Sequence, residues 1–570
     1  MSTDHITVED ASATFTPPGP GTWENDTSHC PPAATPLFQR LASTSMTEAY
    51  REVFAEWGAP LQTMEVRFVN GKMYRRLVPL IGANRSVPPP PRPVLWAATR
   101  LHPAFRERER AARRALAERP YLAVIDGWVG GERAAWIERN LAVQAIDPAR
   151  LGDGDLADHV EAVGSHLQDG WDRHHRLHGS DLGPIGDLLA NASRWGLDPV
   201  QVMALLRGAS PATREVRLFG RRTADALRAG GVDPATVSTL DDVRSVPAAA
   251  EALDAYLREF GWRVVTSYDV EGLTIGELPS ATCALIRACA TSEGLDDDGP
   301  PADPGPLRAS VPADERVRFD ELLADARRAY GVRDDNGPLT AEWPMGLLRR
   351  AYLEAARRLT GSSRLSEATD VFELDVDEVA GALRGAPTPS AADVAGRAAT
   401  RAQHATVSSP ALLGPKLPPP DTSAFPPGIR RTMEIILAVV SNLEPDPTQV
   451  RHGLRGLGIG TGRHRGIARV ATDPERVLDE MEPDDVLVAA WTAPTYNAVL
   501  AIAGGVVVQE GALLCHAAVM ARELGIPAVV GCHRAMELIG DGDLIEVDAD
   551  TGAVTVLERR SAIERTPAAV

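Results

Sequence analysis

The chain has 570 residues, of which 44% are hydrophobic and 24% charged, a composition typical of a globular protein with room for two or more domains. It carries 78 acidic and 59 basic residues, and the net charge of −19 argues against a nucleic-acid partner or an anionic membrane surface. The five cysteines are scattered without a Cys-x-x-Cys spacing, so we expect no disulfide framework and no metal site. No apolar run has the length of a membrane span or a signal peptide, and we expect a cytoplasmic protein.

The first half of the chain predicts a disordered arm and then a mainly helical region. Residues 1–22 are polar and rich in proline and glycine, and we expect them to be disordered. A helix is predicted over 47–58, and the alternation around Asn70-Gly71 predicts a β-hairpin with a type I′ turn. After the proline-rich connector 87–93, most of the sequence up to about residue 395 has helical periodicity.

Three of the four histidines in the segment SHLQDGWDRHHRLHG, residues 165–179, lie close together near its end. His174 and His178 are four residues apart and therefore share a helix face, with His175 beside them. One interpretation makes one of the three a general base for an acceptor hydroxyl. The other is a polar helix that lines a cleft or the surface, since the segment lacks the His-Glu-x-x-His pattern of a metal site.

Two arginine-bearing segments add candidate ligand contacts. Arg263, in residues 256–279, can clamp a phosphate or carboxylate through two nitrogens, or it can form an ion pair with Asp269 or Glu277. Arg350 lies in a predicted helix after residue 347, where it either faces substrate or the solvent.

The last third of the chain changes character. Residues 404–427 hold seven prolines, a density that excludes a helix or a central strand and predicts an extended linker. A short helix is expected over 432–443, as a hinge. From about residue 450, strands and helices alternate, with strands predicted over 466–472, 485–491, 505–508 and 528–530, and this pattern predicts a compact β/α layer fold.

His516 lies at the predicted start of a helix within this β/α region. Ala517, Met520, Ala521 and Leu524 recur at helical spacing, and Gly525-Ile526-Pro527 ends the helix. The helix dipole disfavours a positive charge at this end, so the imidazole is expected to act as a neutral nucleophile. The free backbone N–H groups of the first turn can then hold a phosphoryl group on the ring.

The segment GALLCHAAVMARELGIPAVVG, residues 511–531, resembles the phosphohistidine swivelling domain of phosphoenolpyruvate-utilising enzymes. The residues that fall on the family pattern are His516, Ala517, Ala518, Ala521, Arg522, Glu523, Leu524, Gly525, Ile526, Pro527 and Gly531. Cys515 stands where the family usually has Ser or Thr, and cysteine keeps the size and a weak hydrogen-bond donor. The resemblance implies that His516 carries the phosphoryl group, with Cys515, Arg522, Glu523, Gly525 and Pro527 in docking or structural roles.

Weaker resemblances extend the family likeness to the helical region. Residues 23–37 resemble the opening of the substrate domain in the α subunit of phenylphosphate synthase, and this places His29 among the candidate substrate-binding residues, unless it pairs with Asp26 to stabilise a loop. Residues 256–279 and 370–378 resemble segments of rifampin phosphotransferase and of phosphoenolpyruvate synthase-like enzymes. The predicted domains are an arm (1–22), a mainly helical substrate-binding domain (23–403), a linker and hinge (404–449), the phosphohistidine domain (450–560) and a tail (561–570).

The resemblance implies a phosphotransferase of the dikinase-like class that is split between polypeptides. No segment resembles the ATP-grasp domain that phosphorylates the histidine in dikinases, so the expected partner is a separate ATP-grasp protein that uses ATP and Mg²⁺. His516 would then pass the group to a hydroxyl or enol of a small molecule bound near Arg263, His174, His178, Arg350 or His29, and phosphorylation would either be the product or prepare a dehydration. The alternatives are a non-catalytic phosphocarrier or ligand-binding regulatory protein, and a degenerate homologue, which Cys515 leaves open.

Overall fold

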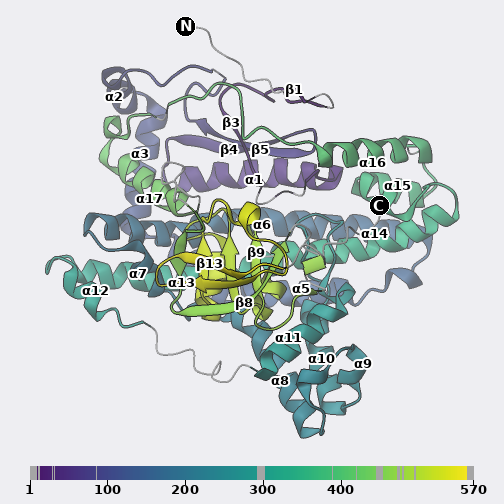
Figure 1. Ribbon diagram of the computed structural model, residues 1–570. Helices are drawn as coiled ribbons and strands as arrows, with labels where there is room; N and C mark the ends of the chain where they lie inside the picture. The colour runs from purple at the N-terminus through teal and green to yellow at the C-terminus, as the bar shows by residue number, and fades with distance from the viewer. Residues whose placement is uncertain are drawn as a thin grey trace. The chain divides into compact units, whose positions relative to one another are not determined.

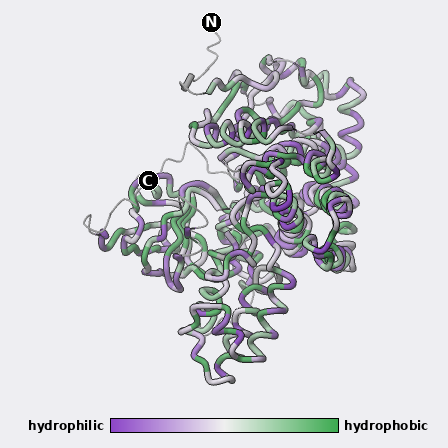
Figure 2. Tube along the Cα trace, turned by 90° about the vertical axis from the view of Figure 1, so that its right-hand side faces the viewer, coloured by the Kyte–Doolittle hydropathy of each residue, from purple (hydrophilic) through white to green (hydrophobic). Residues whose placement is uncertain are grey.

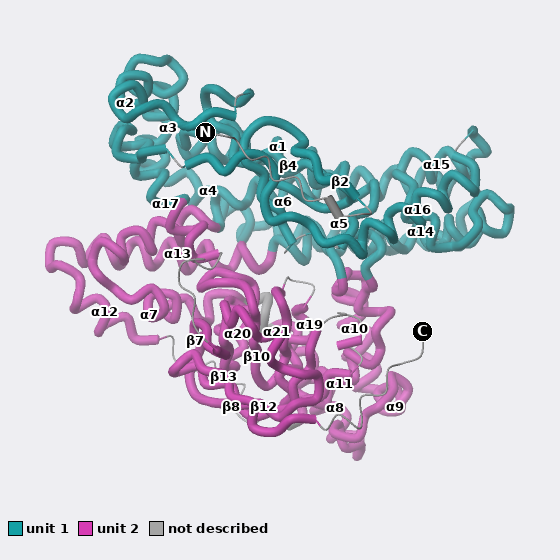
Figure 3. The backbone as a smooth tube through the Cα atoms, turned by 45° about the horizontal axis from the view of Figure 1, so that its top comes forward, with its two compact units in different colours: residues 1–181, 267–272, 336–436 teal, residues 182–266, 273–335, 437–570 magenta. Residues whose placement is uncertain are grey.

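The computed structural model describes residues 9–10, 13–27, 30, 32–84, 86–291, 302–387, 389–418, 420–443, 453–471, 476–477, 480–492 and 496–560. The chain divides into two compact units, and each unit combines three separate segments of the sequence (Figure 3). Unit 1 comprises Met1–Asp181, Ser267–Gly272 and Asn336–Ile436, and unit 2 comprises Leu182–Thr266, Leu273–Asp335 and Leu437–Val570. The division falls inside three helices, α6 (Asp153–Arg194), α13 (Arg316–Gly337) and α17 (Pro427–Leu443).

A four-stranded antiparallel sheet packed on helix α1 (Pro36–Glu56) begins unit 1. Its order is β4-β5-β3-β6, with bounds Leu61–Val69, Lys72–Pro79, Trp23–Asn25 and Leu412–Leu413. Asn70 and Gly71 connect β4 to β5 with φ angles of 52° and 71°, so the predicted hairpin is confirmed. A side chain at Gly71 would also meet Ala33, with a contact of 3.1 Å to its Cβ.

Helices make up the rest of unit 1. They are α2 (Arg92–Leu101), α3 (Pro103–Glu118), α4 (Tyr121–Gly127), α5 (Arg133–Gln144), the first part of α6, α14 (Trp343–Gly361), α15 (Val376–Leu383) and α16 (Ala391–Thr406). Along most helices, hydrophobic and hydrophilic residues alternate, as expected for helices with one buried face (Figure 2).

Two segments that the sequence predicts as extended or disordered are packed into unit 1. Phe15, within the predicted arm, is 1% exposed and lies in a hydrophobic cluster with Trp23 and Tyr74. In the predicted linker, Phe425 and Ile429 are buried in a cluster with helices α2 and α3. Aromatic and branched apolar side chains among the prolines explain the difference, because their burial stabilises an ordered path for the backbone.

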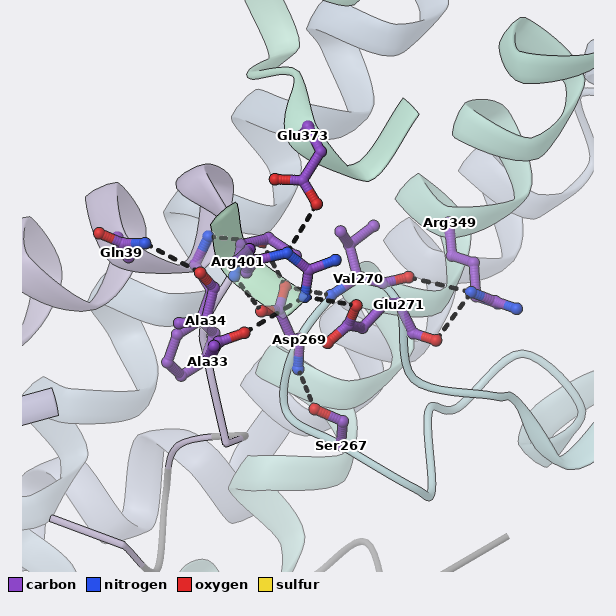
Figure 4. Close-up of polar contacts among 12 residues, drawn as sticks. Ala33, Ala34, Gln39, Ser267, Asp269, Val270, Glu271, Arg349, Glu373 and Arg401 are labelled. Atoms are coloured by element: carbon purple, nitrogen blue, oxygen red, sulfur yellow. Dashed lines mark hydrogen bonds and ion pairs between the residues drawn. The ribbon is translucent and has the colours of Figure 1, made fainter. Parts of the chain in front are cut away.

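The loop Ser267–Gly272 is part of unit 1, and the buried carboxylate of Asp269 attaches it to helix α1 (Figure 4). The backbone N–H and the hydroxyl of Thr35 donate to the two oxygens of Asp269 at 2.8 and 2.6 Å, and the N–H of Val270 donates at 2.7 Å. The same Thr35 hydroxyl accepts from the N–H of Phe38 and caps helix α1. Burial and then the neighbouring Glu271 carboxylate raise the pKa of Asp269 to about 7, although the three donors favour its ionised form.

Arginines complete the network around this loop. Arg401 of α16 binds Glu271 at 2.8 Å and Glu373 at 2.6 Å, and Arg349 of α14 donates to the carbonyl of Glu271 at 3.0 Å (Figure 4). The loop is therefore held at its side chains and at its backbone by helices that lie far away in sequence.

The helical part of unit 2 is formed by α7 (Pro199–Ala204), α8 (Pro211–Ala229), α9 (Leu240–Arg244), α10 (Pro247–Phe260), α11 (Pro279–Thr291), α12 (Gly305–Ser310) and most of α13. Phe219 of α8 stacks on Tyr256 of α10, with ring centroids 3.8 Å apart. Burial raises the pKa of Tyr256. These helices share one hydrophobic core with the β/α part of the unit.

The β/α part of unit 2 is a seven-stranded mixed sheet of order β13-β12-β8-β9-β10-β11-β7 (Figure 1). Its strands are β7 (Leu457–Ile459), β8 (Arg463–Ala471), β9 (Val486–Ala489), β10 (Gly505–Val508), β11 (Ala528–Val530), β12 (Leu544–Asp548) and β13 (Ala553–Glu558). Strands β8 to β11 are parallel, and α19 (Asn497–Ile502) and α20 (His516–Leu524) connect them.

Side chains of the central strands alternate between two cores. Leu487 of β9 and Val506 of β10 face the core shared with the helices, whereas Val486 and Val507 face a second cluster on the other side of the sheet. The structure confirms the predicted class, a mainly helical region followed by a compact β/α layer fold. Among the described residues, no helix combines the length and the apolar character that crossing a bilayer requires.

The Asp269 network predicts a pH-dependent stability. Because the folded pKa of Asp269 is raised, the folded state holds a proton that the unfolded state has lost between about pH 4 and 7. The stabilisation is therefore greatest at low pH and is lost as the pH rises through 7. Relative to the Asp269→Asn variant, the free energy of unfolding of the wild type should fall by on the order of 2 kcal/mol between pH 5 and pH 8 in chemical denaturation. Parallel curves for the two proteins would contradict the assignment.

Candidate functional site

His516 is the first residue of helix α20, which runs nine residues to Leu524. Strand β10 precedes it, and a loop beginning near Gln509 connects strand and helix. The helix ends at Gly525, whose φ of 67° is the left-handed conformation that glycine adopts without strain. The predicted helix start and stop are thus confirmed, and the imidazole lies at the end of the helix where N–H groups have no intrahelical acceptor.

Two neutral side chains hold the His516 ring. Its Nδ1 lies 3.2 Å from the hydroxyl oxygen of Thr492, and its Nε2 lies 2.7 Å from the amide oxygen of Asn497. An Asn oxygen accepts, so Nε2 carries the proton and Nδ1 accepts from the Thr492 hydroxyl. These two hydrogen bonds therefore fix the orientation of the imidazole ring. Because both partners are uncharged, replacing either bond does not require an ion pair to be broken.

The loop before His516 is tightly shaped around Cys515. Cys515 has the extended conformation of an N-cap residue, with φ −64° and ψ 156°. Gly511 has a φ of 112°, and a side chain there would come within 2.7 Å of the Cys515 sulfur. Burial raises the pKa of the Cys515 thiol. The thiol is thus a neutral packing group beside the histidine, and it lacks the thiolate that nucleophilic chemistry requires.

Arg522 and Glu523 are buried and make structural contacts on α20. The guanidinium of Arg522 donates to the Tyr330 hydroxyl at 3.0 Å and to the carbonyl of Leu513 at 3.1 Å. Glu523 accepts from the backbone N–H of Gly208 at 3.1 Å. Burial raises the pKa of Tyr330, so its hydroxyl remains protonated. These contacts join the histidine helix to α13 and to the turn after α7.

Further arginines bind the backbone on either side of His516. Arg217 of α8 donates to the carbonyl of Leu524 at 3.1 Å, at the C-terminus of α20, where cations favour the helix dipole. Arg333 of α13 donates to the carbonyl of Leu514 at 3.2 Å. Gly525 lies close to Arg207, because a side chain at Gly525 would meet the guanidinium at 2.9 Å. Pro527 follows and leads into β11.

In unit 1, the predicted histidines lie together on α6. The ring centroids of His174 and His178 are 4.8 Å apart, and His175 lies 4.8 Å from His174. Nδ1 of His178 lies 3.1 Å from a carboxylate oxygen of Asp181, and Nδ1 of His174 is hydrogen-bonded to the amide oxygen of Asn336.

The other predicted ligand contacts have local partners. The Nε of Arg263 donates to the carbonyl of Glu259 at 3.1 Å, and its guanidinium lies 4.0 Å from the Phe260 ring centroid. Arg350 donates to the carbonyl of Gln144, the last residue of α5, at 2.8 Å. Burial lowers the pKa of Arg350. His29 lies outside the described residues.

The two carboxylates suggested as partners of Arg263 accept hydrogen bonds from threonine residues. Asp269 binds Thr35, and Glu277 accepts from the N–H and hydroxyl of Thr274 at 2.9 Å in a capping box. These contacts give both acids a structural role.

A bound metal ion needs several ligating side chains close together. Within the described parts of the chain, no three or more His, Cys, Asp or Glu side chains are grouped so that they could hold a metal ion. The two side chains that hold the His516 ring are a hydroxyl and an amide.

Thr492 and Asn497 are the site residues that sequence analysis missed. Thr492 follows β9, and Asn497 is the first residue of α19. Because β9 and β10 are parallel neighbours, the segments after their carboxyl ends meet at one edge of the sheet. A polar residue at the start of the apolar helix NAVLAI is the signal that could have identified Asn497.

The segment around His516 is similar in sequence to known proteins. Residues 481–552 match the family model described as the PEP-utilising enzyme, mobile domain. The chondramide synthase cmdD of Chondromyces crocatus is 27% identical over 94% of this chain and 14% of its own length. A rifampicin phosphotransferase from a Streptomyces species is 30% identical over 56% of this chain and 36% of its own length. An uncharacterised phosphotransferase, YvkC of Bacillus subtilis (strain 168), is 26% identical over 53% of this chain and 36% of its own length.

The chain spans about a third or less of the length of these curated relatives. The matched segment contains strands β9 to β12, helix α20 and the three residues His516, Thr492 and Asn497. The segment that holds the helix-terminal histidine, residues 481–552, is thus similar to the mobile domain of PEP-utilising enzymes.

Proposed function

We propose that the protein is a phosphotransferase subunit in which His516 carries a phosphoryl group. A partner places the group on the imidazole, and the chain delivers it to a hydroxyl or enol of a small molecule. The observation that carries the proposal is the position of the His516 ring at the N-terminus of α20, with Thr492 and Asn497 orienting its two nitrogens.

This geometry suits a phosphoryl carrier in two respects. The free N–H groups of the first turn and the positive end of the helix dipole favour a dianionic phosphoryl group on the ring. Fixed neutral partners orient the nitrogen that attacks, and pre-orientation is the main contribution that a protein makes to phosphoryl transfer. The guanidinium of Arg333, which binds the backbone two residues before His516, adds positive charge near the loop.

The donor side of the reaction is assigned to a separate ATP-grasp protein. It would bind ATP together with Mg²⁺, which neutralises the phosphate charge during transfer. A carrier residue separates the ATP-binding site from the acceptor site and allows each to exclude water.

The acceptor side is assigned to a small hydroxyl compound. Two of the relatives are named phosphotransferases, and one of them is named for rifampicin. Phosphorylation of a hydroxyl is either the final product or converts the hydroxyl into a leaving group for dehydration.

Phosphorylation of His516 should depend on the partner. Incubation of the chain with ATP, Mg²⁺ and an ATP-grasp protein should give an acid-labile mass increase of one phosphoryl group, and peptide mapping should place it on His516. The His516→Ala variant should show no increase, because the nucleophile is missing. No adduct with any donor, phosphoenolpyruvate included, would refute the carrier role.

The orientation of the ring should control the rate of loading. We expect Asn497→Ala to slow phosphorylation of His516 by about 10- to 100-fold, because the imidazole loses the contact at Nε2 and samples unproductive orientations. Thr492→Ser retains the hydroxyl at Nδ1 and should load at nearly the wild-type rate. Rapid-quench measurement of the acid-labile adduct gives both rates. Equal rates for Asn497→Ala and the wild type would show that this contact does not matter.

A further inference from the structure

A polar cluster in unit 1 remains unexplained by the chemistry of His516. It consists of His174, His175, His178 and Asp181 on α6, together with Asn336 at the end of α13. Asp181 and Asn336 have no exposed surface, whereas the side chain of His178 is 20% exposed. Burying charged and polar groups costs free energy unless hydrogen bonds compensate for it, so the arrangement of these bonds is informative.

The hydrogen bonds form a chain that ends on the Asp181 carboxylate. Oδ2 of Asp181 accepts from Nδ1 of His178 at 3.1 Å and from the amide nitrogen of Asn336 at 3.2 Å. The amide oxygen of Asn336 in turn accepts from Nδ1 of His174. Asn336 therefore holds the carboxylate with one end of its amide and a histidine with the other.

The second oxygen of this carboxylate is the unusual feature. Oδ1 of Asp181 is buried and has no hydrogen-bond partner among the described residues. A buried carboxylate oxygen without a donor is costly, and such groups are often retained for function. The chain also forms a π-helical turn at Pro338–Glu342, directly after Asn336 and Gly337, and π-helical turns are frequent at functional sites.

The contact with Asp181 fixes the tautomer of His178. A carboxylate only accepts, so Nδ1 of His178 must carry the proton, and Nε2 then presents a lone pair. An aspartate that holds one imidazole nitrogen so that the other acts as base is the arrangement of acid–base dyads in hydrolases. His175 differs, because its Nδ1 binds the backbone carbonyl of Trp171 at 2.9 Å and the residue is only 5% exposed.

We propose that His178 is the general base for the acceptor hydroxyl, and that Asp181 and Asn336 position it. This inference rests on the proposed function and names the site at which the acceptor is activated. The substrate class is a small molecule with a hydroxyl group that reaches Nε2 of His178.

The transfer step balances with these groups. The acceptor oxygen attacks the phosphorus of phospho-His516, the P–N bond breaks, and the hydroxyl proton moves to Nε2 of His178. The other ring nitrogen of His516 carries a proton during this step, so the imidazole leaves as a neutral group. The products are the phosphate ester, neutral His516 and protonated His178, which then releases its proton to water.

The first test is a transfer assay with simple hydroxyl probes. The chain is loaded with ³²P on His516, freed of ATP, and mixed with methanol, phenol or hydroquinone. We expect His178→Gln to load normally but to transfer the label to the probe at least about 100-fold more slowly, the usual contribution of a general base. His404→Gln, which changes a histidine in the last turn of α16, is the matched control and should behave as the wild type.

The second test needs no acceptor and no loading. ¹⁵N-histidine NMR of the full chain should show His178 as the Nδ1–H tautomer, and Asp181→Asn should shift it towards the Nε2–H tautomer. Wild-type transfer rates in His178→Gln, or a proton on Nε2 of His178 in the wild type, would overturn the proposal. If none of the hydroxyl probes accepts the label, the proposal is decided by the NMR measurement of the His178 tautomer alone. If the wild-type chain cannot be phosphorylated on His516 at all, the carrier role of His516 is refuted, whereas the assignment of His178 is not.

Discussion

The parallel pairing of β9 with β10 is the constraint on which the site depends. Val486 pairs with Gly505 and Ala489 with Val508, so the two strands end side by side. The segment after β9 then supplies Thr492 and Asn497, and the segment after β10 supplies His516. Both strands are fully buried, and their alternate side chains fill two separate cores. A shift of one residue would exchange the side chains between these cores, so packing fixes the register and, with it, the contacts of the imidazole.

The histidine helix is also tied to helices from an earlier part of the chain. The contacts between α20 and the helical part of unit 2 include the buried hydrogen bond from Arg522 to Tyr330 and the bond from Arg217 to the carbonyl of Leu524. Any movement of the mobile domain away from α8 and α13 must break these bonds and hydrate the groups again. Water compensates for part of that loss, and a hydrogen bond donated by a charged guanidinium contributes about 1.5–3 kcal/mol to the docked arrangement. The histidine helix is therefore held in a defined position by a small number of hydrogen bonds that water can replace.

The sequence predicts structural features well where the signals are local. Glycine and proline punctuation after Leu524, the apolar runs of the central strands and the Asn70-Gly71 turn each depend on a few neighbouring residues, and the structure confirms all three. The Thr492 and Asn497 contacts could not be predicted in this way, because they arise only when two strands pair. The same applies to Asp269, which lies 234 residues from its partner Thr35.

The helical region shows a second reason why some features of the structure could not be predicted from the sequence. Proline density in residues 404–427 correctly excludes a long helix, but it does not indicate that Phe425 is buried, because that depends on α2 and α3. Likewise, i, i+4 spacing places His174 and His178 on one face of α6, but the neighbouring Asp181 and the distant Asn336 decide how each ring is oriented. Sequence spacing therefore identifies the groups, and tertiary contacts determine their chemistry.

The most direct test of the carrier role is a ³¹P NMR spectrum of the chain after loading by an ATP-grasp protein, recorded before and after brief acid treatment. A phosphoryl group on His516 gives a phosphoramidate resonance that acid abolishes and that is missing in the His516→Ala variant. An acid-stable phosphate ester instead, as expected for phosphorylation of the neighbouring Thr492 hydroxyl, would contradict the account.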